Sequence, residues 1–514
     1  MAIFLLLAAA ISCESAHEYD IVIKGGTIYD GSGKVPYIGD LAVKNDTIAA
    51  IGEFDGSAGL TIDADGKAVA PGFINMLSWA NVSLLHDGRS QSDIRQGVTL
   101  EVMGEGHSMG PLNDRMKQEM VEKQGDIKFE VTWTTLGEYL RHLEEIGVSP
   151  NVTSFVGNGT VRQHVMGYEN RAATENEMET MKELVTEAMR EGAVGLSSSL
   201  LYVPSRYADT RELIELARVA GSHGGMYISH IRDEGANLIP SVEELIRIAR
   251  EADIRSEIYH LKASGEENWH KLDTVIEMIE EARSASPPVQ VTADMYTYPA
   301  SSTGLNVQLP EWVREGGIEA TIERLTNPET RRRILTEITF THSPDKILLV
   351  GFRNPDLRKH IGKYLSEIAA DRGQSPEETM VDLIVEDNSR IQVVYFSMSE
   401  ENIRKKIQQP WMSFCSDAAS YSAEGIFLRQ STHPRAYGSF ARVLGKYCRE
   451  EGLLTLQEAV RRLAALPARN LRLEKRGMLK PGYFADLVVF DPETVTDHAT
   501  FEKPHQYATG VSDV

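Results

Sequence analysis

Short apolar runs alternate with longer amphipathic segments through most of the chain. Apolar runs bounded by turn residues are typical of buried strands, whereas apolar positions three and four residues apart indicate helices. The helical pattern is clearest at residues 175–191, 210–223 and 241–251. The expected strands are residues 69–75, 98–105, 152–157, 193–198, 226–230, 257–261, 289–296 and 411–417. Strands that alternate with helices in this way predict an α/β fold, a (β/α)8 TIM-type barrel with its functional residues at the strand C-termini.

Both ends of the chain carry a different pattern. Residues 19–68 alternate apolar and polar positions between Gly and Asp turns, which indicates short strands of a small all-β unit. A matching strand is expected at residues 482–491. The economical prediction is a small β-sandwich built from residues 19–68 and 478–514, with the barrel at residues 69–477 between them.

One connection is too long for an ordinary loop. Residues from about 299 to 406 separate the last two expected barrel strands, and they contain helical patterns and a strand at residues 346–350. A segment of this length with its own elements is an insertion. The pattern favours equally a lid beside the site and extra packing on the outside of the barrel.

The composition limits the classes of partner. The chain has 514 residues and a formal net charge of −22, which argues against nucleic acid and anionic membrane surfaces. Its three cysteines, Cys13, Cys415 and Cys448, form no Cys-x-x-Cys pair. This excludes both a disulfide framework and a zinc cage made of thiolates. A small-molecule substrate remains the expected partner.

The first 18 residues look like an export signal with a lipoprotein-like cleavage site. Their apolar run is too short to span a bilayer, and small residues and a polar turn follow it. Cys13, in Ala-Ile-Ser-Cys, is a candidate lipid anchor, which predicts a periplasmic or membrane-anchored protein. The alternative is an unprocessed or mis-started N-terminus and a cytoplasmic protein.

Two histidines occupy equivalent positions at neighbouring strand ends. His230 ends the run Tyr-Ile-Ser-His, and His260 follows the next apolar run. Glu105, at the end of the second expected strand and between two glycines, adds a carboxylate on backbone that can approach an ion closely. One carboxylate and two imidazoles with a position left for water are the ligand set of a catalytic zinc. Each residue alone would more often be an ordinary polar side chain.

Further polar residues near the strand ends could act on a substrate. Asp417, at the end of the eighth expected strand, is suited to move a proton from water to a leaving amine, or alternatively to cap a helix. Tyr202 and Tyr296 could donate to an oxyanion or simply pack. Lys262 should share a strand face with the second histidine, and Arg435 could clamp a substrate carboxylate. For the last two, the alternative is a surface salt bridge.

Several motifs together resemble the N-acyl-D-amino-acid deacylases (D-aminoacylases) of the amidohydrolase superfamily. They lie at residues 20–31, 70–74, 229–235, 260–262, 301–305, 433–438, 479–486 and 502–507. The resemblance covers nearly the whole chain beyond residue 18. It implies a (β/α)8 barrel with a small β-sandwich, and hydrolysis of the amide bond of N-acyl-D-amino acids at a zinc site.

Matched position by position, the resemblance also implies residue roles. Glu105 falls, with a one-residue gap, where the family has a bridging cysteine. The remaining matches are metal ligands (His230, His260), an acid/base (Asp417), a carboxylate-binding arginine (Arg435) and pocket residues (Tyr202, Tyr296, Lys262).

The chain departs from the superfamily pattern in three places. Most members carry His-x-His after the first strand, where this chain has Leu77 and Trp79, and residues 195–199 contain no lysine that could bridge two metals. One zinc ion is therefore expected. Relatives would also continue beyond residue 514 through further sandwich strands, so a truncated sandwich is expected.

These observations predict a zinc-dependent hydrolase that releases a D-amino acid and a carboxylate. Two alternatives stay open. One is a different cyclic-amide or dipeptide amidohydrolase, because fold and metal chemistry are shared across the superfamily. The other is a metal-free descendant that only binds a ligand, which Leu77 and Trp79 would favour.

Overall fold

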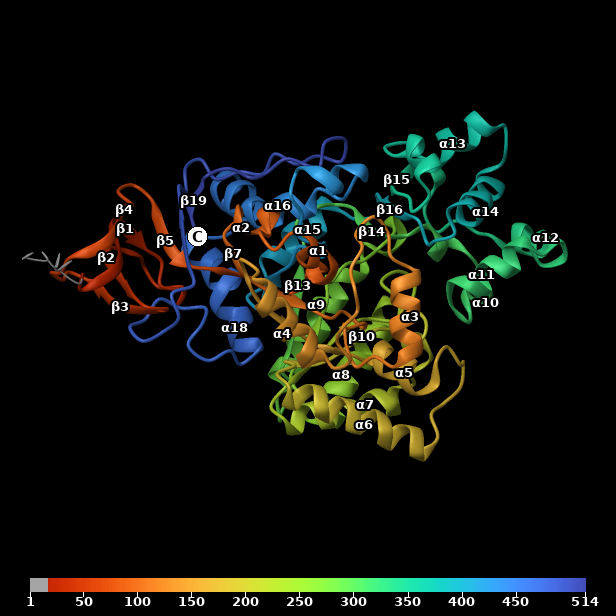
Figure 1. Cartoon of the computed structure of the whole chain (residues 1–514), viewed down its shortest axis with the longest axis horizontal. Coiled ribbons are helices and arrows are strands. Elements are labelled where there is room, and N and C mark those ends of the chain that lie inside the picture. The colour runs from red at the N-terminus through yellow and green to blue at the C-terminus, as the bar shows by residue number, and fades with distance from the viewer. Residues whose placement is uncertain (1–16) are drawn as a thin grey trace, which may run out of the picture.

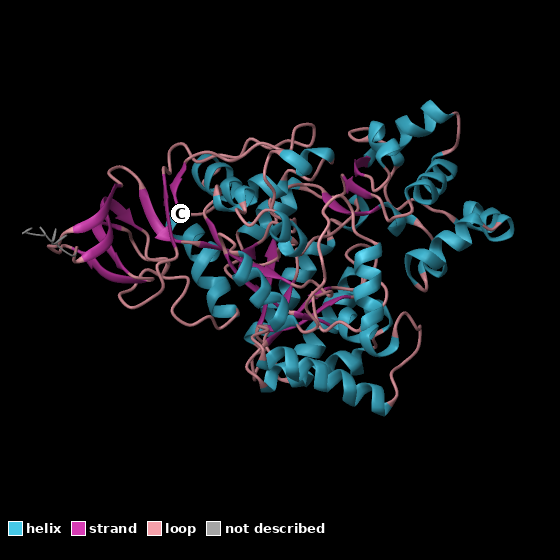
Figure 2. Ribbon diagram, in the orientation of Figure 1, coloured by secondary structure: helices cyan, strands magenta, loops and turns pink. Residues whose placement is uncertain are grey.

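The computed structural model describes residues 17–514, so the expected export segment and Cys13 lie outside the described residues. Three parts follow one another across the molecule: a small sheet, a barrel surrounded by helices, and a helical insertion (Figures 1 and 2). Within residues 17–514, no helix combines the length and the apolar composition needed to cross a lipid bilayer.

The barrel is a ring of parallel strands. A six-stranded sheet in the order β17-β13-β12-β11-β10-β9 and a three-stranded sheet β6-β7-β8 make up its wall. The ring closes where the amide of Asp417 donates to the carbonyl of Leu77 at 2.9 Å and that of Met76 donates to Phe414. The barrel strands are β6 (Phe73–Asn75), β7 (Val98–Met103), β8 (Asn151–Ser154), β9 (Val156–Gly157), β10 (Gly195–Ser199), β11 (Met226–His230), β12 (Ser256–Ile258), β13 (Val291–Met295) and β17 (Met412–Phe414).

Amphipathic helices cover the outside of the barrel. Their start signals are local: Thr135 and Thr174 each close a capping box at the first turn of a helix. The helices are α1 (Ala80–His86), α2 (Gln91–Ile94), α3 (Asp114–Glu122), α4 (Leu136–Ile146), α5 (Asn158–Met166), α6 (Glu175–Arg190), α7 (Thr210–Ser222), α8 (Leu238–Ala252), α9 (Lys271–Ser284), α15 (Glu400–Ile407), α16 (Arg435–Arg442), α17 (Leu456–Val460) and α18 (Leu466–Asn470).

Most observed strands are shorter than expected, so Glu105 and Asp417 lie just beyond theirs. Three strands differ further. Residues 69–75 split, because their first half pairs with the small sheet and only β6 joins the barrel. Residues 152–157 are interrupted at Phe155, between β8 and β9. The sixth strand ends at Ile258, so His260 lies in a turn beyond it rather than within the strand.

The small sheet draws its strands from both ends of the chain. β1 is central: its first half lies between β2 and β4, and its second half pairs with β5. β18, from the far end, pairs antiparallel with β5. The division of the chain into domains at the expected boundaries stays a prediction. The strands are β1 (Tyr19–Ile28), β2 (Tyr37–Lys44), β3 (Thr47–Gly52), β4 (Ala58–Asp63), β5 (Ala68–Pro71), β18 (Leu487–Phe490) and β19 (Val511–Asp513).

The insertion between β13 and β17 has an apolar core of its own, which includes Leu305, Leu349 and Leu383. Its Thr303 lies within 2.6 Å of the Tyr202 hydroxyl, beside the strand ends that carry the site residues. This contact favours the lid interpretation over packing on the outside of the barrel. The elements are β14 (Ser301–Gly304), α10 (Glu311–Arg314), α11 (Gly317–Thr326), α12 (Pro328–Glu337), β15 (Ile347–Gly351), α13 (Leu365–Arg372), α14 (Pro376–Asp387) and β16 (Gln392–Tyr395).

Candidate metal centre

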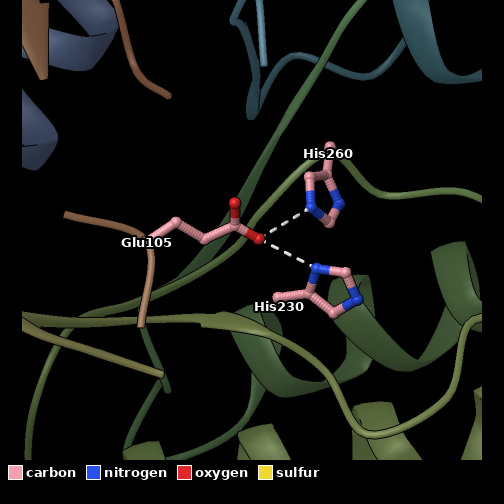
Figure 3. A group of neighbouring side chains, drawn as sticks. All are labelled: Glu105, His230 and His260. Atoms are coloured by element: carbon pink, nitrogen blue, oxygen red, sulfur yellow. Dashed lines mark hydrogen bonds and ion pairs between the residues drawn. The ribbon is translucent and has the colours of Figure 1, made fainter. Parts of the chain in front are cut away.

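Glu105, His230 and His260 converge at the C-terminal end of the barrel (Figure 3). Glu105 Oε1 lies 2.8 Å from His230 Nδ1 and 3.2 Å from His260 Nε2. The three donor atoms lie within 4.8 Å of one another, and all three residues are buried. The residues that the sequence singled out from three different strands thus share one point in space.

The glycines on either side of Glu105 let its backbone reach the cluster. Gly104 and Gly106 have φ values of +98° and +62°, which side chains other than glycine rarely adopt. A Cβ at Gly106 would lie 2.4 Å from Ser199 Cβ, so this turn presses directly against β10. The Gly106 amide also donates to Ser197 Oγ at 3.0 Å. The carboxylate is therefore held by its backbone rather than by a flexible loop.

Two other site residues have left-handed backbone. His260 has φ +36° and Asp417 has φ +49°, and neither is a glycine. Such conformations cost free energy and persist where the surrounding structure fixes them, which is common at functional sites. At Asp417 the fixing contact is its amide hydrogen bond to Leu77, and at His260 it is the 2.8 Å hydrogen bond from its amide to Asp294 Oδ1.

The donor set fits a zinc ion. Imidazole nitrogens and a carboxylate oxygen are ligands that zinc prefers. His230 Nε2 is buried without a hydrogen-bond partner among the described residues, which leaves a lone pair or proton for a further group. Burial would raise the pKa of Glu105, but hydrogen bonds from both histidines outweigh it and lower that pKa, so the carboxylate is charged. These residues can therefore hold a divalent cation.

Glu234 is a site residue that the sequence reasoning missed. Its Oε1 lies 3.0 Å from His260 Nδ1 and 2.6 Å from Lys262 Nζ, and its Oε2 lies 4.0 Å from His230 Nε2. Burial and Lys262 lower the pKa of His260, but Glu234, Asp417 and Glu105 raise it to about 10; a metal cation that binds His260 would displace this proton. The available signal was its place four residues after His230 in the same polar run.

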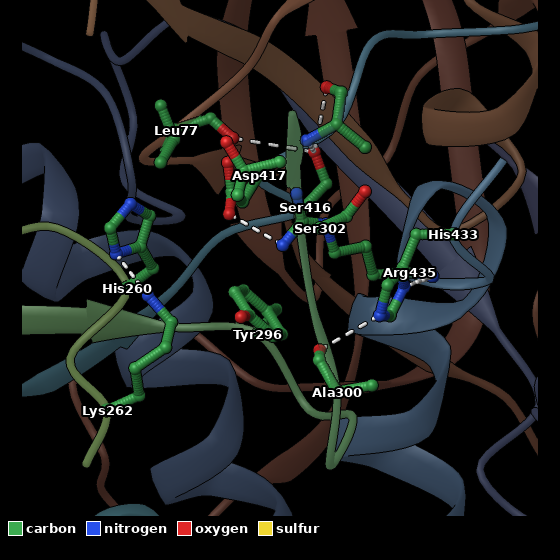
Figure 4. A network of polar contacts seen from close by, with 12 residues as sticks. Leu77, His260, Lys262, Tyr296, Ala300, Ser302, Ser416, Asp417, His433 and Arg435 are labelled. Carbon is green, nitrogen blue, oxygen red and sulfur yellow. Dashed lines mark hydrogen bonds and ion pairs between the residues drawn. The ribbon is translucent and has the colours of Figure 1, made fainter. Parts of the chain in front are cut away.

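Asp417 and Arg435, expected to act separately, form an ion pair with each other (Figure 4). Arg435 Nη1 lies 2.6 Å from Asp417 Oδ2, but at an angle that makes no hydrogen bond. Nε and Nη1 of this buried guanidinium consequently have no hydrogen-bond partner among the described residues. Its plane lies over the ring of Tyr296, with Cζ 4.5 Å from the ring centroid. Arg435 therefore keeps donors for a carboxylate.

The three remaining candidates have partners in the protein. Tyr202 packs its ring edge-on against His230 at 5.2 Å, and its hydroxyl is hydrogen-bonded to the insertion. Lys262 Nζ lies 2.7 Å from His260 Nδ1 and 5.7 Å from the Tyr296 ring centroid. The Tyr296 hydroxyl donates to the sulfur of Met398 at 3.4 Å. All three line the site, and their roles toward a substrate stay predictions.

The positions of the missing His-x-His offer no metal donors. Leu77 is fully buried, and its carbonyl accepts the hydrogen bond that closes the barrel, while Trp79 is 36% exposed. The fourth strand, β10, ends in serines. These positions therefore supply no ligands for a second metal ion, and the arrangement suits one ion.

A parallel barrel with metal donors at its strand ends is the architecture of the amidohydrolases, and a family model described as "Amidohydrolase family" matches residues 419–514. The chain is 33% identical to the D-aminoacylase of Alcaligenes xylosoxydans xylosoxydans over 98% of this chain and 94% of that relative. It is 32% identical to the N-acyl-D-aspartate deacylase of the same organism over 97% of this chain and 91% of that relative. Within the amidohydrolase superfamily, the chain belongs to the D-aminoacylase family.

A solved structure of the same family supports the fold. The N-acyl-D-glutamate deacylase of Bordetella bronchiseptica, complexed with zinc and a phosphonate inhibitor that mimics the tetrahedral intermediate, superposes with a TM-score of 0.79 at 32% identity. The match covers 96% of this chain and 94% of that one. The resemblance stated from the motifs is confirmed, as is the barrel with its small β unit.

Proposed function

We propose that this protein hydrolyses the amide bond of N-acyl-D-amino acids and depends on one zinc ion. The observation that carries the proposal is the juxtaposition of a zinc-type donor set with a buried arginine, Arg435, whose Nε and Nη1 make no hydrogen bond among the described residues. The first can activate an amide, and the second can hold the carboxylate that every N-acyl amino acid carries. Relatives named for this activity, one of them complexed with zinc, add support.

The residues divide the reaction between them. Glu105, His230 and His260 would hold the zinc, which when bound polarises the acyl carbonyl and lowers the pKa of water. A water oxygen adds to the acyl carbon, and the carbon–nitrogen bond breaks. Asp417 takes the proton from the attacking water and delivers it to the leaving nitrogen. The products are a carboxylate and a D-amino acid.

The ion pair between Asp417 and Arg435 couples substrate binding to this proton transfer. A substrate carboxylate that reaches Nε and Nη1 of Arg435 competes with Asp417 for the guanidinium. Bidentate binding of the substrate would loosen the pair and free Asp417 to face water. The guanidinium of Arg435 lies over the Tyr296 ring, and this contact fixes its orientation. Tyr296 therefore acts as a positioning residue.

The test measures metal content and hydrolysis together. The zinc-loaded protein is given N-acetyl-D- and N-acetyl-L-amino acids, and release of the free amino acid is followed. We expect stoichiometric zinc and turnover of D-configured substrates. The Asp417→Asn variant should keep its zinc and lose about 100-fold or more of the activity, because a positioned acid/base typically contributes that much.

A matched control separates chemistry from folding. Asp382 is a partly exposed carboxylate of the insertion that pairs with Arg331, and Asp382→Asn should leave turnover unchanged. Full turnover in Asp417→Asn, or a protein that binds no zinc, would contradict the proposal.

We also propose that the protein is exported and lipid-anchored through Cys13. The support is the short apolar segment and the Ala-Ile-Ser-Cys sequence. Fractionation of cells that express the full chain should find it with membranes, and Cys13→Ala should release it. Recovery of both forms in the cytoplasmic fraction would contradict the anchor.

A further inference from the structure

A cavity of about 330 Å³ lies between the loop after β10 and helix α10 of the insertion. Leu200 and Val203 line it on the barrel side. Tyr202, between these two in sequence, packs against the metal-centre residue His230. The cavity therefore lies beside the loop that carries Tyr202, on the same face of the barrel as the candidate metal centre. A volume of this size can hold a small organic molecule.

Three guanidinium groups converge on this cavity. Arg206 and Arg232 come from barrel loops, and Arg314 ends helix α10. Arg206 pairs with Glu311, and Arg232 pairs with Glu244 at 2.6 Å. No carboxylate among the described residues lies within 4.0 Å of Arg314, although every other arginine of this cluster has one.

Arg314 is the unusual member because it is both charged and unpaired. Its Nε is buried without a hydrogen-bond partner among the described residues. Burial lowers the pKa of Arg314. Burial also lowers the pKa of Arg206, and the positive charges of Arg314 and Arg232 lower that pKa further. Arg314 as a whole is half-buried, and a partly desolvated charge without a counter-ion is costly. An anion in the cavity would reduce that cost.

The acidic residues of the lining are already engaged. Glu311 is the partner of Arg206, and Glu315 accepts a hydrogen bond from Asn170 Nδ2 at 3.2 Å. The lining thus has three cationic side chains against two anionic ones. This local excess of positive charge stands out in a chain whose net charge is −22.

We propose that this cavity is a carboxylate-binding site in which Arg314 is the principal donor. A carboxylate matches the planar fork of a guanidinium, and two such oxygens can be shared between neighbouring arginines. The bound group would join Arg314 of the insertion to Arg206 and Arg232 of the barrel, beside Tyr202. Its source is either a free small carboxylate or the second carboxylate of an acidic substrate; the latter source rests on the proposed function.

The first arm of the test needs no activity. Melting of the zinc-loaded protein is measured in sodium succinate against sodium chloride at matched ionic strength. Succinate should raise the melting temperature, and Arg314→Gln should raise the half-saturating concentration about ten-fold or more, because hydrogen bonds to a charged group are among the strong ones. Arg314→Lys, which keeps the charge, should recover part of the effect. Arg333→Gln is the matched control, since Arg333 is an exposed arginine of the same insertion, paired with Glu337.

The second arm separates the two sources. KM is measured for N-acetyl-D-glutamate and N-acetyl-D-alanine in the wild type and in Arg314→Gln. A rise of about ten-fold or more for the acidic substrate alone assigns the site to the second carboxylate of the substrate. A succinate effect without that rise assigns it to a free carboxylate. If the wild type hydrolyses neither substrate, the proposed function fails while the melting arm still decides. Two results would overturn the site. In the first, Arg314→Gln has the same succinate dependence and the same KM values as the wild type. In the second, succinate does not change the melting temperature and the KM for the acidic substrate is unchanged in Arg314→Gln.

Discussion

Replacing Gly106 by alanine tests whether the backbone, rather than a mobile side chain, places Glu105 in the metal centre. Gly106 has φ +62°, and an added Cβ would lie 2.4 Å from both Cβ and Oγ of Ser199 and 2.6 Å from the Ser199 amide nitrogen. An ordinary contact needs 3.4 Å or more, so the turn would have to withdraw from β10 by about 1 Å. Ser199 Cβ belongs to a buried strand and cannot give way easily.

The size of the effect follows from that displacement. Alanine in the left-handed region costs roughly 1–2 kcal/mol, and overpacking a tight contact adds roughly 1–3 kcal/mol. Metal ligands tolerate errors of only about 0.2 Å in distance, so a shift of about 1 Å should weaken or remove the Glu105 contact. We expect the zinc affinity to fall by about 10–100-fold, as it does when the support of a ligand is lost.

The assay is competition for zinc with a chromophoric chelator, read alongside the melting temperature. Gly66→Ala is the matched control, because Gly66 has φ +73° in the turn between β4 and β5 and a Cβ there would meet no atom within 4 Å. That variant bears the conformational cost alone and should bind zinc like the wild type. Equal zinc affinity in Gly106→Ala and Gly66→Ala would refute the reasoning.

Three further results are expected. Glu234→Gln should weaken zinc binding about 10–100-fold, because Glu234 contacts His260 from behind, and unchanged affinity would contradict this role. Burial, and next the charge of Asp294, raise the pKa of Glu257 from 4.5 to about 8. Between these two pH values the folded state holds a proton that the unfolded state has lost, so stability should fall as the pH rises from about 4.5 to about 8 and level off above that. Glu257→Gln should flatten that fall in melts at pH 6 and pH 9, and parallel profiles would argue against it. Chelating the zinc should lower the melting temperature and abolish hydrolysis, and added zinc should restore both unless the metal is incidental.

The barrel could be predicted because each of its strands and helices has a local signature. The strand Met226–His230 was placed to the residue, since an all-buried apolar run ends there at a polar residue. The convergence of its histidine with His260 and Glu105 followed from the rule that parallel strands end on one face. The split of residues 69–75 between two sheets could not be predicted, because both halves are equally apolar and only their distant partners differ.

The contacts between side chains of the site were beyond the reach of local patterns. Asp417 and Arg435 were expected to act separately, and their pairing depends on how the loop after the eighth strand folds back. Nothing local distinguishes Glu234, because an acid in a polar run is usually solvated. Glu234 is only half-buried, and its contacts come from His260 and Lys262, which lie just beyond the end of β12.

The hydrogen bond from the Asp417 amide to the Leu77 carbonyl gives one residue two separable duties. Its main-chain amide hydrogen-bonds the last barrel strand to the first, while its carboxylate points into the active site. Side-chain replacements at 417 should therefore yield inert but intact molecules, well suited to trapping an uncleaved substrate. A proline at position 417 has no N–H to donate and would therefore also remove the hydrogen bond that closes the barrel.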